Sequence, residues 1–80
     1  MILVEIDYTN HAGERRKRVV RPGSIAMHTS AYHSGGAHWI LFAMDWERRE
    51  VREFLMSNIH SWRELTPAEQ LYGQVTIAKG

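Results

Sequence analysis

Cysteine is absent from this 80-residue sequence, and its absence limits the ways in which the chain can fold. A chain of this length forms one domain at most and buries only about 60–65 % of the surface that its unfolded form exposes. Disulfides and Cys-ligated zinc, which stabilise many small domains, are excluded. The core must therefore come from apolar side chains, which make up 44 % of the residues. We expect a single domain over residues 1–80 and no large enzyme with a cofactor cleft between domains.

No apolar run approaches the roughly 18–20 residues of a membrane span. Met1-Ile2-Leu3-Val4 is too short for the apolar part of a signal peptide, and no basic stretch precedes it. We therefore expect no membrane partner and a location in the reducing cytoplasm.

Positive charge is concentrated in one short segment, although the net charge of the whole chain is only +1. Residues 14–21 contain five basic side chains and one acidic one, a net charge of +4. A basic stripe on a near-neutral body is typical of a site for an anion or a nucleic-acid backbone. The alternative is a solvated edge strand whose charges prevent unwanted strand pairing. On such a strand, Arg16 and Arg18 should share one face, and Arg15, Lys17 and Arg21 the other.

Two kinds of apolar pattern predict a mainly β fold. Residues 1–9 show the period of two that is typical of a half-buried strand. The almost wholly apolar stretch within 37–45 is typical of a strand buried on both faces. Pro22-Gly23 should end a strand, because proline cannot donate to a ladder. The predicted strands cover 1–9, 14–20, 37–45, 50–59 and 74–79, with a turn at 10–13 and an irregular segment over 23–36.

Thr66-Pro67-Ala68-Glu69 predicts the start of a short C-terminal helix. It combines a capping box with proline at the first helical position, and Gly73 should stop the helix two turns later. Five short strands and one short helix predict a small, strongly bent sheet or barrel.

Four short motifs occur in an order that is typical of one family. They are Ile6-Asp7-Tyr8 before a turn at Gly13, Arg18-Val19-Val20-Arg21-Pro22, Trp39 to Asp45, and Arg52-Glu53-Phe54 in a strand closing at Ile59. With them, residues 4–62 resemble the WYL domain of bacterial and phage regulators. The resemblance implies a five-stranded Sm-like or SH3-like barrel with a regulatory, non-catalytic role. The helix-turn-helix module that usually precedes such a domain is not present, so we do not expect this chain by itself to be that kind of transcription factor.

The resemblance also implies a ligand pocket, and it places Arg52 there. The alternative for Arg52 is an ion pair with Glu50 or Asp45. Ile40 replaces a tyrosine that faces the ligand in relatives, and Leu55 and Asn58 stand where arginines are common. A site still in use should therefore hold its anion more weakly or differently. The predicted ligand- or nucleic-acid-binding residues are Arg18, Arg21, His38, Trp39, Arg52 and Asn58.

The three tryptophans could stack on bases, but in so small a domain a tryptophan usually belongs to the core. We expect Trp39 in the core or the pocket wall, and Trp62 packed under the helix. Trp46 lies on a charged turn and is the exposed candidate.

The histidines His28, His33 and His38 recur every five residues, which is the period of neither a strand face nor a helix face. No cysteine or nearby carboxylate completes a metal shell, so we expect no metal and no other cofactor. A mobile loop over the pocket is the favoured interpretation, with His33 or His38 able to touch phosphate. No nucleophile elbow or phosphate-binding glycine loop is present, which argues against an enzyme.

Two functions from different classes are consistent with these features. The first is a binding module for a nucleotide or a single-stranded DNA or RNA. The second is a protein-interaction or assembly module, for example a phage-encoded modulator of a host protein. Exposed edge strands and the stability gained by self-association would favour a protein partner or a homo-oligomer.

Overall fold

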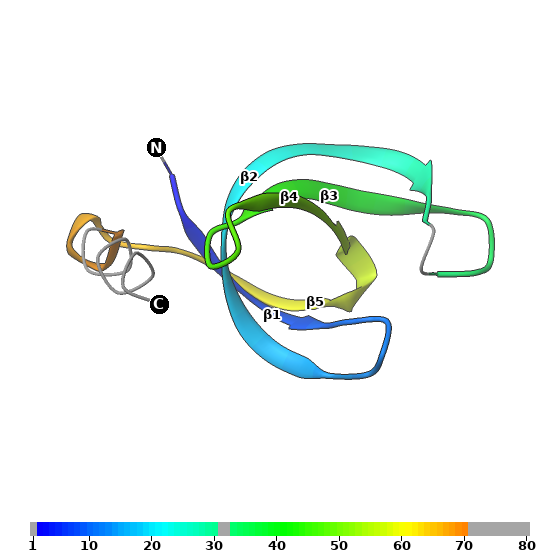
Figure 1. The fold of residues 1–80 in the computed structure, drawn as a ribbon, viewed down its shortest axis with the longest axis horizontal. Helices are drawn as coiled ribbons and strands as arrows, with labels where there is room; N and C mark the ends of the chain where they lie inside the picture. Colours follow the sequence, from blue (N-terminus) through cyan, green and yellow to red (C-terminus); the bar gives the residue numbers. More distant parts are fainter. Residues whose placement is uncertain (1, 31–32, 71–80) are drawn as a thin grey trace.

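The computed structural model of the chain describes residues 2–30 and 33–70, and its strands form one antiparallel sheet (Figure 1). A 3-10 helix, η1 (Met56–Asn58), connects the last two strands, and an α-helical turn begins at Pro67. The mainly β class with five strands is confirmed. The strands are β1 (Val4–Thr9), β2 (Arg15–Thr29), β3 (Ala37–Asp45), β4 (Glu50–Leu55) and β5 (Ile59–Glu64).

The strand order β4-β3-β2-β1-β5 places β4 and β5 at the two edges of the sheet. Strand β2 curves through the whole fold, so that β3 and β4 lie on one side and β1 and β5 on the other (Figure 1). Within the described residues no ladder joins β4 to β5. The predicted barrel is therefore a strongly bent sheet that does not close.

Strand β2 does not end at Pro22-Gly23, as the sequence had led us to expect, but continues to Thr29. The register against β3 shifts between Pro22 and Ser24, which marks a bulge. Proline is tolerated at a bulge because the ladder is already interrupted there, and a bulge bends its strand. Gly23 permits the close approach, since a Cβ at this position would lie 2.7 Å from the carbonyl oxygen of Phe42.

The predicted strand over 50–59 is divided into β4, η1 and the first residue of β5. The fifth strand is therefore formed by Ile59–Glu64, which pairs with β1. Its side chains are almost all exposed, so it carries little of the apolar alternation by which a strand is predicted. The predicted strand over 74–79 and the helix stop at Gly73 lie outside the described residues.

The main core fills the space inside the bend, and a smaller cluster lies near the N-terminus. The smaller cluster consists of Leu3, Trp46 and Leu65. The main core consists of Val4, Ile6, Tyr8, Val20, Leu41, Ala43 and Phe54.

The predictions for Trp46 and Trp62 are wrong. Trp46 is only 7 % exposed, because its ring packs on Leu3 and Leu65 while the guanidinium of Arg49 lies 3.9 Å from the ring centre. The charged neighbours of Trp46 predicted exposure, whereas its burial depends on residues that are distant in sequence. Trp62 is 46 % exposed and lies on the edge strand β5.

The capping box is confirmed. The backbone N–H of Glu69 donates to Thr66 Oγ1 at 3.2 Å, and the backbone N–H of Thr66 donates to Glu69 Oε1 at 3.0 Å. The described residues include no helix of the length and hydropathy that a membrane crossing requires.

Candidate anion-binding site

The basic stretch at the start of β2 sends alternate side chains to opposite faces, as predicted. On the outer face, Arg15 Nε lies 3.0 Å from Asp7 Oδ1, and Lys17 Nζ lies 3.9 Å from Glu5 Oε1. Cross-strand pairing with β1 explains both contacts, because opposite charges stand in neighbouring rows of the ladder. These basic residues are neutralised where they stand and remain largely exposed.

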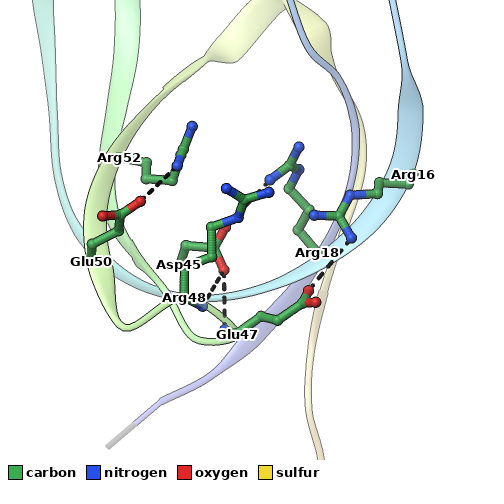
Figure 2. A network of polar contacts seen from close by, with 7 residues as sticks. All are labelled: Arg16, Arg18, Asp45, Glu47, Arg48, Glu50 and Arg52. Carbon is green, nitrogen blue, oxygen red and sulfur yellow. Dashed lines mark hydrogen bonds and ion pairs between the residues drawn. The ribbon is translucent and has the colours of Figure 1, made fainter. Parts of the chain in front are cut away.

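Arg18 is placed differently, because it points to the inner face, where the core lies. Its side chain is only 10 % exposed, and Nη1 lies 3.3 Å from Asp45 Oδ2 (Figure 2). Its Nε is buried without a hydrogen-bond partner. A buried donor without a partner is costly, so this guanidinium retains capacity to bind an acceptor.

Asp45 is 2 % exposed and has a second task at the end of β3. Its Oδ1 accepts the backbone N–H groups of Glu47 at 3.1 Å and of Arg48 at 3.3 Å. The same carboxylate therefore anchors Arg18 and fixes the turn between β3 and β4.

Around Asp45, four arginines gather with two further carboxylates (Figure 2). Arg16 pairs with Glu47 at 3.5 Å, and Arg52 Nη1 lies 2.8 Å from Glu50 Oε1. Burial lowers the pKa of Arg18, and the positive charges of neighbouring arginines lower that pKa further, against the opposing effect of Asp45. Positive charge in this network is therefore incompletely compensated. Its members are Arg16, Arg18, Arg48 and Arg52 with Asp45, Glu47 and Glu50.

Arg18 and Arg52 line one pocket of about 350 Å³, although they come from strands that are not neighbours in the sheet. That volume is at the lower end of the range for small-molecule sites. The pocket combines an apolar wall with charged and hydrogen-bonding groups. It is lined by Tyr8, Asn10, His11, Arg18, Ser30, His33, Ile40, Glu50, Val51, Arg52, Glu53, Phe54 and Leu55.

The WYL domain family model matches residues 3–64, which is most of the chain. The chain belongs to the WYL domain family. No curated protein matches it. WYL domains are generally regulatory binding domains, so membership indicates a regulatory ligand-binding module.

Of the residues predicted to form the site of this WYL domain, Arg18 and Arg52 line the pocket. Both alternatives for Arg52 meet here, because it lines the pocket and also pairs with Glu50. Ile40 and Leu55, which replace family residues of other chemistry, line the pocket as well and make part of its wall apolar.

The other predicted residues lie outside the lining. Arg21 is exposed and forms no ion pair within the described residues. His38 Nε2 lies 2.9 Å from the Ser34 carbonyl oxygen, and Asn58 is half-buried in η1. Trp39 is 56 % exposed, so the prediction that it belongs to the core or the pocket wall is wrong. Its position in an apolar run predicted burial, but this end of β3 extends past the core.

Of the histidines, His33 lines the pocket, and its Nε2 is buried without a hydrogen-bond partner. Its ring centre lies 6.3 Å from that of His38. Across residues 2–30 and 33–70, no three His, Asp or Glu side chains come together in a way that could hold a metal ion.

Sequence reasoning missed Tyr8, which forms one wall. The Tyr8 hydroxyl accepts the backbone N–H of Leu55 at 2.9 Å, and its ring packs edge-on against Phe54 with centres 5.0 Å apart. Burial raises the pKa of Tyr8, so the hydroxyl keeps its proton. Its place on the apolar face of β1 predicts core rather than site, and the motif Ile6-Asp7-Tyr8 indicated the family but not the pocket.

Proposed function

We propose that this WYL domain is a non-catalytic regulatory module that binds a phosphate group, from a nucleotide or a single-stranded nucleic acid, in the pocket shared by Arg18 and Arg52. The observation that carries the proposal is the convergence of these two guanidinium groups from separate hairpins on one pocket. Guanidinium groups bind phosphate with paired hydrogen bonds, which makes arginine the preferred residue for such a ligand.

Arg52 is free to exchange its present partner. Its side chain is 37 % exposed and that of Glu50 is 58 % exposed, so their ion pair contributes only about 0–1 kcal/mol. A doubly charged phosphate can displace one exposed carboxylate at little cost. Glu50 then returns to solvent.

Arg18 supports the proposal from the buried side of the pocket. Its unpaired Nε and the lowered pKa of its guanidinium both describe a cation whose charge is under-compensated. An anion entering the pocket would supply compensating negative charge. The apolar wall of Ile40, Phe54 and Leu55 suits a base or a sugar attached to that anion.

The test is calorimetric titration of the protein with adenosine 5′-monophosphate, inorganic phosphate and a short single-stranded oligothymidylate. Binding should weaken steeply between about 50 and about 200 mM salt, because each phosphate contact releases counterions. Binding that ignores salt, or no binding below about 1 mM ligand, would refute the proposal.

A second candidate function is a protein-interaction or assembly module, and the open sheet favours it. Within the described residues, each of the edge strands β4 and β5 pairs with a neighbour on one side only. The other side of each could pair with a strand of another chain. Light scattering that shows a defined oligomer, together with no nucleotide binding in the titration, would select this function.

A further inference from the structure

Charge is distributed very unevenly along the chain. Residues 22–44 contain no Lys, Arg, Asp or Glu, so all ten basic and all nine acidic residues lie outside this stretch. The stretch covers the second half of β2 and nearly all of β3. Exposed strands normally carry charges that prevent association, and this hairpin has none.

The end of this hairpin lies beyond the rest of the sheet. We call residues 25–29 and 37–41 the distal ribbon, of which only the inner end, Ile40 and Leu41, pairs with β4. Strand β1 pairs with β2 only over 15–20, and β4 reaches along β3 only as far as Ile40. Figure 1 shows the ribbon projecting past the ends of the other strands. A two-stranded hairpin is marginally stable in water by itself, so a ribbon of this kind gains from being covered.

One face of the distal ribbon is apolar and exposed. Met27 and Trp39 stand directly opposite each other, and Ile25 lies two residues along β2 on the same face. Their exposed fractions are 50 %, 56 % and 52 %. Leu41, which stands opposite Ile25 on this face, belongs to the main core, so the exposed patch adjoins the interior of the protein.

The opposite face of the ribbon carries two histidines at its outer end. His28 and His38 stand opposite each other there, and each ring lies within hydrogen-bond distance of a backbone carbonyl, those of Thr29 and Ser34. Within residues 2–30 and 33–70, the exposed large apolar side chains of the ribbon therefore lie on one face.

We propose that the apolar face of the distal ribbon, formed by Ile25, Met27 and Trp39, docks against the same face of a second copy of this chain. A nucleic acid or an acidic protein would need lysines or arginines to hold it, and the ribbon has neither. Two copies of an uncharged face meet without repulsion, and a two-fold axis brings one patch against itself. Trp39 would be the central anchor, since tryptophan is enriched among the residues that dominate such contacts.

The experiment is sedimentation equilibrium of the full chain, loaded over the range from about 5 to about 500 µM that suits a small interface. The wild type should show a monomer–dimer equilibrium. Trp39→Glu should weaken dimerisation at least about 10-fold, with an unchanged circular-dichroism spectrum, because it places two like charges at the centre of the contact.

Trp62→Glu is the matched control, because Trp62 is exposed to a similar degree but lies on the edge strand β5. It should leave the dimer unchanged. A wild type that stays monomeric up to the highest loading overturns the proposal, as does dissociation by Trp62→Glu in place of Trp39→Glu. If Trp39→Glu unfolds the chain, the milder Met27→Ser takes its place with the same expected direction. Loss of oligonucleotide binding by Trp39→Glu in a monomeric protein would instead make the ribbon a nucleic-acid surface.

Discussion

Basic side chains stand on both faces of the basic stretch in β2, but their burial and their partners differ between the two faces. On the outer face, Arg15 and Lys17 meet carboxylates across the ladder and remain 58 % and 69 % exposed. On the inner face, Arg18 is nearly buried and its charge is only partly compensated. Exposed pairs of the first kind contribute little to stability, whereas a buried and under-compensated cation is costly to keep without a functional return.

The number of arginines in a stretch therefore does not define a site. The face to which each side chain points, and the elements that meet it there, decide its role. Arg52 is a second example. It lies in a separate hairpin outside the basic stretch, and the bend of the sheet places it in the same pocket lining as Arg18.

Replacing Arg18 should have the largest effect. Arg18→Met keeps most of the buried volume but leaves Asp45 with two backbone donors and no cation, so the free energy of unfolding should fall by about 2–3 kcal/mol. Arg15→Met on the outer face should change it far less, because that pair is exposed to solvent. Urea denaturation measures both, and equal losses for the two variants would contradict the distinction between the faces.

Removing the competing carboxylate should improve binding. Glu50→Gln releases Arg52 and takes a negative charge from the pocket lining, so the Kd for adenosine 5′-monophosphate should fall about 3-fold or more at low salt. Asp7→Asn releases Arg15 in the same way but faces outward, and it should leave the Kd unchanged. Calorimetry of the two variants checks this, and tighter binding by Asp7→Asn alone would contradict it.

The smallest effect concerns acid stability on the outer face. Arg63, followed by both hydrogen bonds to Thr66, lowers the pKa of Glu69 from 4.5 to about 2. Because the pKa is lower in the folded state, this contribution to stability is complete above pH 4.5 and is lost as the pH falls towards 2. Arg15 likewise lowers the pKa of Asp7, with the same sign.

Carboxyl NMR titration should therefore give a Glu69 midpoint near 2 in the wild type and a higher one in Arg63→Met. The nucleotide Kd should be the same for both proteins at neutral pH, since Arg63 is remote from the pocket lining. A midpoint for Glu69 that Arg63→Met leaves unmoved would show that the helix cap alone sets the pKa.

Much of the fold could be predicted from local patterns. Alternation in residues 1–9, the apolar run of 37–45 and the capping box each report a property that neighbours in sequence determine. Two features could not be predicted in this way, because both depend on strands that are distant in sequence. They are the continuation of β2 through Pro22-Gly23 and the pairing of β5 with β1.

The site divides in the same way. The alternation rule separated Arg18 from Arg15, and the family resemblance identified Arg52. Tyr8 was missed because a wall of a pocket has the same pattern as a core face. Trp39 and Trp46 were misplaced in opposite directions, since burial depends on what covers a residue and not on its sequence neighbours.

We propose that the inner face, and not the basic stretch as a whole, binds phosphate. The most direct test compares Arg52→Met with Arg15→Met, because each removes one partly exposed arginine that pairs with a single carboxylate. Titration with adenosine 5′-monophosphate at about 50 mM salt should show at least a 10-fold weaker Kd, about 1.4 kcal/mol, for Arg52→Met. Arg15→Met should give a Kd within about 2-fold of the wild type. Equal weakening by the two variants would contradict it.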